Sequence, residues 1–183
     1  HSSSDIEIFR NKIYANSRDG IRITGDSDGT DPCNNIYIIN NTIFNNNWKA
    51  VDMFSSNNIT LFNNTIFNSS REGVYISVCS DVIIRNNTIH SNGLSVVPGG
   101  SGIYTTDSTK VAISNNNIFS NTYSAGIFID SSNGTVINNT LMHNMYGIYL
   151  SDINSSCEMY VANNTLQYHS TAGLVVQMSS DVI

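Results

Sequence analysis

Five charged residues are the strongest candidates in this sequence for acid–base chemistry. Asp, Glu, Lys and Arg make up only 12% of the 183 residues, yet these five all lie within residues 22–72: Arg22, Lys49, Asp52, Arg71 and Glu72. A carboxyl group beside basic groups can act as a general acid or base. Asp52 is therefore the candidate catalytic residue, with the other four around it. The alternative is a ladder of exposed salt bridges, which would contribute little stability.

Aromatic residues form a second pattern, because each follows a glycine by two positions. The matching segments are Gly73-Val74-Tyr75, Gly102-Ile103-Tyr104, Gly126-Ile127-Phe128 and Gly147-Ile148-Tyr149. Flat rings that carry a hydroxyl suit the C–H faces of sugars and the water around them. We predict that Tyr75, Tyr104, Phe128 and Tyr149 bind a sugar polymer, with Asp130 beside them. Alternatively, these rings only stabilise a sheet, as cross-strand pairs do.

Two segments contain residue types that bind metals. Asp26, Asp28 and Asp31 offer closely spaced oxygen ligands, which suits calcium although the EF-hand pattern is not met; an ordinary polar turn is the alternative. Met142-His143-Asn144-Met145 offers thioether and imidazole groups, which suit copper. A local hydrophobic turn is the alternative for this second segment.

The elements that position these candidates come from a repeat. The motif Asn-Asn-Thr followed by Ile or Leu, with close variants, recurs along the chain, and the second residue of each pair is Asn11, Asn41, Asn64, Asn87, Asn116, Asn139 or Asn164. Successive separations are 30, 23, 23, 29, 23 and 25 residues. A base period of 23 with insertions is typical of stacked coils with surface loops. We expect each pair to form a sharp bend, with its first member (Asn40, Asn63 and Asn86, for example) also turned inward.

Each repeat contains three short stretches of alternating apolar residues, which predict three short strands per coil. No single unit could bury its apolar face, so the coils must stack about 4.8 Å apart. We predict one all-β domain over residues 1–183. Stacking would place Arg22, Asp52 and the aromatic residues in one outward column. A rival outward column, which we interpret as a packing face, would contain Tyr14, Phe44, Phe67, His90, Phe119, Met142 and Gln167.

The repeats Asn-x-Ile-x-Asn-Asn-Thr-Ile and Gly-Ile-x-Leu resemble those of the pectate-lyase-like superfamily over essentially the whole chain. They are most similar to repeats of carbohydrate-binding proteins, sugar hydrolases and a periplasmic protein of copper maturation. The resemblance implies a single-stranded right-handed parallel β-helix of about seven coils. In that superfamily, active sites lie on the outer face of the Gly-Ile-x-Ile strand; lyases there use a Lys or Arg base, and hydrolases use clustered Asp. Because these repeats encode the scaffold, no catalytic motif carries over.

Insertions mark candidate functional loops. The first insertion brings the three aspartates described above, and the second includes residues 94–100, between Asn87 and Gly102. We expect this second loop to project over the edge of the candidate face, either as a wall of a substrate groove or as a tolerated surface excursion.

Composition excludes some partners and leaves others open. A net charge of −6 with eight basic residues argues against nucleic acids, and the lack of an 18-residue apolar run argues against membrane insertion. No capping helix is predicted at either end, so we expect flanking domains or neighbouring subunits there and a chain that is part of a longer protein.

Three function hypotheses follow. The leading one is an extracellular or cell-surface module, with the periplasm as the other compartment, that binds a polysaccharide. If it is also an enzyme, it is a polysaccharide lyase or a glycoside hydrolase. The second hypothesis is a structural or adhesive rod, and the third and weakest is periplasmic copper delivery.

Overall fold

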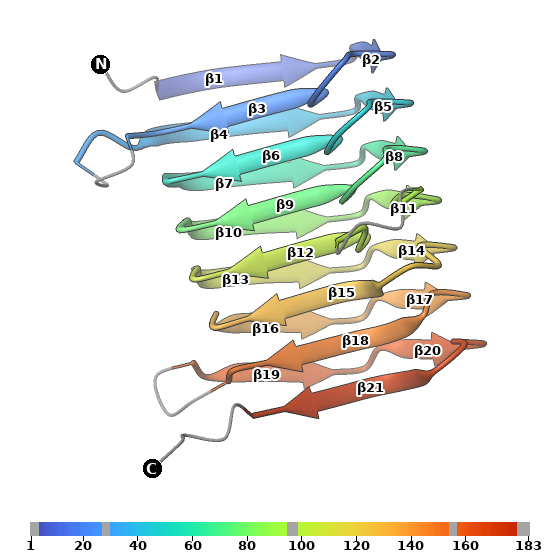
Figure 1. Ribbon diagram of the computed structural model, residues 1–183. Coiled ribbons are helices and arrows are strands. Elements are labelled where there is room, and N and C mark those ends of the chain that lie inside the picture. The colour runs from blue at the N-terminus through green and yellow to red at the C-terminus, as the bar shows by residue number, and fades with distance from the viewer. Residues whose placement is uncertain (1–3, 27–29, 95–98, 154–156, 179–183) are drawn as a thin grey trace.

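The computed structural model describes residues 4–26, 30–94, 99–153 and 157–178. Within these residues, 21 strands form three parallel sheets of seven strands each. Figure 1 shows the sheets as the sides of one stack of coils, with the two chain ends at opposite ends of the stack. The predicted parallel β-helix of three strands per coil and seven coils is confirmed. Among the described residues, no helix is long and apolar enough to cross a membrane.

The three strands of each coil belong to different sheets. Sheet A consists of β1 (Ser4–Phe9), β4 (Cys33–Ile39), β7 (Ser56–Phe62), β10 (Ser80–Arg85), β13 (Thr109–Ser114), β16 (Gly134–Ile137) and β19 (Met159–Ala162). Sheet B consists of β2 (Lys12–Tyr14), β5 (Thr42–Phe44), β8 (Thr65–Phe67), β11 (Thr88–His90), β14 (Asn117–Phe119), β17 (Thr140–Met142) and β20 (Thr165–Gln167). Sheet C consists of β3 (Ile21–Thr24), β6 (Val51–Phe54), β9 (Val74–Ser77), β12 (Ile103–Thr106), β15 (Ala125–Asp130), β18 (Tyr146–Ser151) and β21 (Ala172–Gln177).

The core consists of columns of β-branched side chains that run along the stack. In sheet A, Ile36 pairs with Ile59, and Ile59 pairs with Val82. All three side chains are almost fully buried. Because side chains alternate across a strand, their neighbours along the chain point outward and form columns of their own. The strand pairing therefore decides which surface residues become neighbours.

The marker asparagines form a buried ladder at the corner between sheets A and B. Asn64 donates its backbone N–H (2.8 Å) and its Nδ2 (3.0 Å) to Oδ1 of Asn87 in the next coil. Its Nδ2 also donates to the backbone oxygen of Ile38 in the preceding coil, at 2.8 Å. These bonds satisfy backbone groups that the sharp corner would otherwise leave buried and unpaired. Each asparagine within the ladder, as distinct from its two ends, therefore ties three successive coils together.

The first asparagine of each pair does not turn inward, so that expectation is wrong. Asn63 and Asn86 are exposed and Asn40 is partly exposed. Their φ angles are 58° at Asn40, 55° at Asn63 and 57° at Asn86. Asparagine is one of the few side chains that tolerate this left-handed backbone. The first member therefore makes the bend, and only the second fills the interior.

A second polar ladder, which was not predicted from the sequence, lies at the corner between sheets B and C. It consists of Asn16, Asn46, Ser69, Asn92, Asn121, Asn144 and His169, each five residues after a marker asparagine. For example, Asn92 donates its backbone N–H (3.0 Å) and its Nδ2 (3.3 Å) to Oδ1 of Asn121. Ser69 interrupts this ladder. Among the described residues, Nδ2 of Asn46 and Oγ of Ser69 have no hydrogen-bond partner.

Where Ser69 interrupts the second ladder, the residue that faces it from the neighbouring coil also differs from the usual glycine. In most coils, a glycine near the start of the sheet C strand leaves room for an asparagine of the next coil. A Cβ on Gly73 would lie 2.8 Å from Asn92 Nδ2, and one on Gly102 would lie 3.0 Å from Asn121 Nδ2. Opposite Ser69, the equivalent residue is Ala50, and both are fully buried. The extra methyl group of Ala50 and the shorter side chain of Ser69 therefore compensate each other.

We predict that Ser69→Asn alone destabilises the protein, because the longer side chain meets the methyl group of Ala50 in a packed interior; the cost of such overpacking is about 1–3 kcal/mol. Adding Ala50→Gly should recover most of this loss, since the second ladder then becomes continuous. Chemical denaturation of the two single variants and the double variant, analysed as a double-mutant cycle, measures the coupling. Additive effects of the two substitutions would contradict the proposed compensation.

Candidate functional site

The outer face of sheet C brings the predicted site residues into one column. Arg22 pairs with Asp52, and Asp52 pairs with Tyr75. The column continues through Tyr104, Phe128, Tyr149 and Val175. These positions are separated by 21 to 30 residues in the sequence. The β-helix makes them direct neighbours because the parallel strands pair without a shift in register.

Asp52 is at the centre of a compact ionic cluster. Its residue exposure is only 7%. Oδ1 lies 2.8 Å from Nζ of Lys49, and Oδ2 lies 3.6 Å from Nε of Arg22. The same Lys49 ammonium group lies 3.5 Å from the centre of the Tyr75 ring, a cation–π contact. Both carboxylate oxygens of Asp52 therefore face basic groups of the protein itself.

Arg71 and Glu72 form a separate pair one coil further along. Nη2 of Arg71 lies 3.5 Å from Oε1 of Glu72, and the Arg71 guanidinium lies 4.6 Å from the centre of the Trp48 ring. Oε1 also accepts the backbone N–H of Gly100, at 3.3 Å. Glu72 is fully buried, and no residue of the described chain donates a hydrogen bond to its Oε2. The five predicted charged residues thus divide into two groups rather than one.

Tyr104 and Asp130, both predicted to bind the sugar polymer, contact each other. The Tyr104 hydroxyl donates to Oδ2 of Asp130 at 3.4 Å. Burial, followed by the nearby charge of Asp130, raises the pKa of Tyr104 to about 12. Burial, followed by the charge of Asp152, raises the pKa of Asp130. Burial is also the main cause that raises the pKa of Tyr75. Both phenols therefore remain protonated near neutral pH and act as hydrogen-bond donors rather than as bases.

The two aromatic columns of the protein differ in ring orientation. On sheet B, the rings from Tyr14 to Phe119 stack face to face, with centroids 4.7–5.0 Å apart and planes within 7°. On sheet C, the Tyr75 and Tyr104 planes meet at 88°, and those of Tyr104 and Phe128 meet at 63°. Phe128 and Tyr149 stack again, at 9°. Face-to-face neighbours cover one another's ring faces, as Phe128 and Tyr149 also do, whereas Tyr104 is tilted against both of its neighbours.

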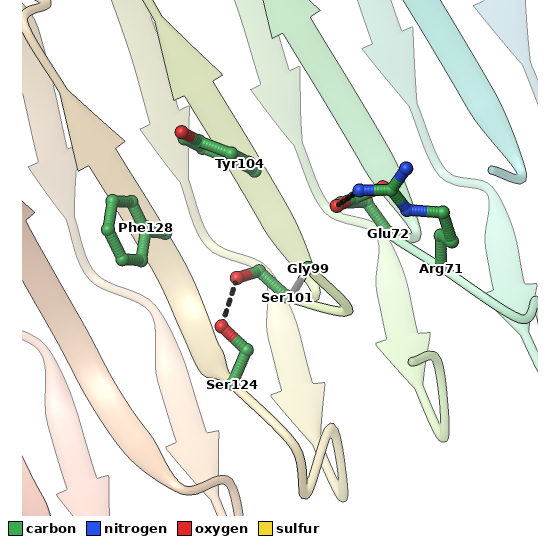
Figure 2. A pocket seen from close by; sticks show the side chains of 7 residues that line it. All are labelled: Arg71, Glu72, Gly99, Ser101, Tyr104, Ser124 and Phe128. Atoms are coloured by element: carbon green, nitrogen blue, oxygen red, sulfur yellow. Dashed lines mark hydrogen bonds and ion pairs between the residues drawn. The ribbon is translucent and has the colours of Figure 1, made fainter. Parts of the chain in front are cut away.

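A pocket of about 350 Å³ opens beside these tilted rings. It is lined by Arg71, Glu72, Gly99, Ser101, Tyr104, Ser124 and Phe128. Figure 2 shows how the pocket extends across neighbouring coils, with the two aromatic rings on one side and Arg71 and Glu72 on the other. The Ser101 and Ser124 hydroxyls, 2.8 Å apart, hydrogen-bond to each other between these sides. The volume suits one group of small-ligand size.

The second insertion supplies part of this pocket. Gly99 is a lining residue, and Gly100 contacts Glu72; residues 95–98 of the insertion lie outside the described residues. Gly99 has a φ of 126°, and a Cβ there would contact Glu72 Oε1 and lie 2.8 Å from Arg71 Nη2. The sequence located this loop at the edge of the face. It gave no signal for the serine pair or for the burial of Glu72.

The metal-site predictions gain little support. Asp26 and Asp31 lie between β3 and β4, where the Asp26 N–H donates to the Asp31 backbone oxygen at 3.3 Å, and Asp28 lies outside the described residues. The described chain contains no group of three His, Cys, Asp or Glu residues that could hold a metal ion. His143, the imidazole of the copper hypothesis, stacks on Tyr168 at 5.2 Å, and the adjacent Asn144 belongs to the second ladder.

Comparison with known proteins defines the family. The chain matches the family model described as "Right handed beta helix region" over residues 1–129 and again over residues 30–183. Together these matches span the whole sequence, so the chain belongs to the right-handed β-helix family. A comparison with curated protein sequences finds no match.

Solved structures with a similar fold include three epimerases. The A-module of Azotobacter vinelandii mannuronan C-5 epimerase AlgE6 has a TM-score of 0.72 and 18% identity, over 99% of this chain and 56% of that one. The AlgE4 A-module from the same organism has a TM-score of 0.70 and 15% identity, over 93% of this chain and 55% of that one. The periplasmic alginate epimerase AlgG has a TM-score of 0.60 and 16% identity, over 96% and 40%. The chain thus spans about half the length of the two A-modules.

We predict that Lys49→Met destabilises the fold by about 3 kcal/mol, because it removes the closest partner of a nearly buried carboxylate. Replacing both residues, as Lys49→Met with Asp52→Leu, should cost less than the single change, since no buried charge is then left without its main partner. Thermal and urea unfolding measure both. Lys110→Met is the matched control: its 3.3 Å pair with Asp81 is exposed, so less than about 1 kcal/mol is expected. Equal losses for the two lysines would contradict this account.

Proposed function

We propose that this protein binds a polysaccharide along the outer face of sheet C. The observation that carries the proposal is the orientation of Tyr104, whose plane meets that of Tyr75 at 88° and that of Phe128 at 63°. Sugars pack their C–H faces on aromatic rings, which requires that a ring face be open to the ligand. On sheet C, Tyr104 is not stacked face to face with either neighbouring ring, and it lines a pocket together with polar groups. The stacked rings of sheet B offer mainly their edges.

The spacing of the column supports a polymeric ligand. Ring centroids follow one another at 5.4, 4.9 and 4.8 Å from Tyr75 to Tyr149. This is close to the distance between successive strands and roughly the length of one sugar residue. An extended chain that runs along the stack can therefore meet one coil after another. A small isolated ligand would use only one of these positions.

The similar solved structures agree with this proposal. Their names describe enzymes of mannuronan and alginate, which are polysaccharides, and one is named as periplasmic. By analogy we place this protein outside the cytoplasm, at the cell surface, in the periplasm or in the medium. The analogy supports a polysaccharide as the class of ligand. The individual sugar has to be inferred from the residues of the site.

Cleavage of the bound polymer is the second candidate function, and the position of Lys49 favours it. Its ammonium group is held between Oδ1 of Asp52 (2.8 Å) and the Tyr75 ring (3.5 Å), at the start of the aromatic column. A ligand that covers Tyr104 and extends to Tyr75 would therefore meet a lysine and a carboxylate held in fixed geometry. In this candidate function, Asp52 and Lys49 transfer protons during bond cleavage, and Arg22 positions Asp52.

The binding proposal predicts that Tyr104→Ala and Phe128→Ala each weaken polysaccharide binding by at least about tenfold, since stacking and hydroxyl contacts are lost. Affinity electrophoresis or calorimetry against a panel of soluble polysaccharides measures this. Phe67→Ala is the matched control, because it removes one ring from the sheet B stack and should leave binding unchanged. Binding that survives both sheet C substitutions would contradict binding along sheet C, whereas no binding by the unsubstituted protein would favour the structural-rod hypothesis.

The cleavage candidate predicts that Asp52→Asn lowers the rate of polymer cleavage by about 100-fold or more, the usual effect of losing a general acid or base. Release of new reducing ends from each bound polysaccharide measures the rate. Asp81→Asn, an exposed aspartate on sheet A, is the control and should leave the rate unchanged. Cleavage at an unchanged rate in Asp52→Asn would remove Asp52 from the reaction.

A further inference from the structure

The pocket beside Glu72 has features that select among sugars. Glu72 is fully buried, and its two carboxylate oxygens have different environments. Oε1 faces Nη2 of Arg71 at 3.5 Å and accepts the Gly100 N–H at 3.3 Å. No described residue donates a hydrogen bond to Oε2, although Glu72 lines the pocket. A buried carboxylate oxygen without a donor is costly, so a ligand that supplies one gains affinity.

We propose that this pocket binds one uncharged sugar residue of the polymer, with a sugar hydroxyl donating to Oε2 of Glu72. This inference rests on the proposed polysaccharide-binding function and specifies its ligand. Tyr104 and Phe128 line both the aromatic column and the pocket, so a polymer on the column can place one residue in the pocket. The volume of about 350 Å³ accommodates a group of this size.

Charge argues against an acidic sugar in the same position. A uronate carboxylate has no proton to donate to Oε2, and it would face the negative charge of Glu72 in a partly desolvated pocket. Arg71 does not reverse this balance, because its guanidinium is already engaged by Oε1 of Glu72 and by the Trp48 ring. Asp130 adds a further negative group, held against the Tyr104 hydroxyl that borders the pocket.

The serine pair fits the same ligand. The Ser101 and Ser124 hydroxyls, 2.8 Å apart, can each donate and accept. They can therefore pair with neighbouring sugar hydroxyls, which also do both. A protonated amino sugar would satisfy Oε2 as well, but its ammonium group cannot accept a hydrogen bond from either serine and would lie near Arg71. The full set of lining groups thus favours hydroxyls.

The decisive comparison uses hexamers of the same linkage that are neutral, acidic or basic. We expect a hexamer of β-1,4-linked mannose, or a glucose hexamer of the same linkage, to bind at least tenfold more tightly than the hexamer of β-1,4-linked mannuronate. A β-1,4-linked glucosamine hexamer should also bind more weakly than the better neutral hexamer. Isothermal titration calorimetry at fixed ionic strength provides the affinities. Tightest binding by the mannuronate or the glucosamine hexamer, or no binding by either neutral hexamer, would overturn the inference.

Variants locate the selectivity in the pocket. Glu72→Gln should weaken binding of the neutral hexamer about tenfold, because a charged acceptor becomes a neutral one, and should narrow its advantage over mannuronate. Glu7→Gln is the matched control: Glu7 is an exposed residue of sheet A, so its substitution should leave the affinity for the hexamers unchanged. Since Glu72 is buried, Ser124→Val provides a second test: it fills the pocket from its half-buried rim and should also weaken neutral binding. Unchanged affinity and selectivity in both pocket variants would overturn the assignment.

These outcomes separate the inference from the function on which it rests. If mannuronate binds best and Tyr104→Ala abolishes that binding, polysaccharide binding by sheet C stands and the neutral-sugar pocket fails. If none of the hexamers binds and none of the larger polysaccharides binds, the proposed function itself fails.

Discussion

The structure depends on the hydrogen bonds that hold each corner of the coil at a fixed register with the next. A chain that turns sharply buries backbone groups that no sheet ladder can satisfy. Asn41, Asn64 and Asn87 satisfy them, because one side-chain amide both accepts from the preceding coil and donates to backbone oxygens. With the corners fixed, strands pair without slipping, and a one-residue slip would exchange the buried and exposed faces of a strand. The columns of surface residues exist only because this register is maintained.

The second ladder shows that side chains facing each other in the interior must match in size, although their identities can differ. Glycine faces asparagine at most positions, and Ala50 faces Ser69 at one. The two arrangements fill similar space, but only the first continues the hydrogen bonds. The interruption lies in the same coils as the Asp52 cluster and the Arg71–Glu72 pair. In these coils, both the buried ladder residues and the charged residues of the outer face therefore differ from the residues found at the same positions of the other repeats.

The functional interpretation depends on the difference between two columns that look alike in sequence. Both contain aromatic residues at the spacing of the coils, yet the rings of sheet B cover one another while Tyr104 and Phe128 do not. The tilted ring of Tyr104, a carboxylate oxygen with no donor among the described residues and a pair of hydroxyls then meet at one pocket. Each group is common by itself. Their convergence on the face next to the Lys49–Asp52 pair makes sheet C the site of the proposed function.

The sequence by itself determined the coils, because the interval between marker asparagines counts the residues in each turn and the alternation of Ile and Val gives the strands. It also placed Arg22, Asp52 and Tyr75 in one column, since equal positions in a repeat must stack. It could not show that Asn63 points outward while Asn64 points inward, because both residues are asparagines and asparagine suits either position of a bend. Only the tertiary structure decided the tilt of Tyr104, the burial of Glu72 and the partners of Asp52. Those properties depend on side-chain rotamers and on contacts between coils, and the repeat leaves them open because it specifies the backbone alone.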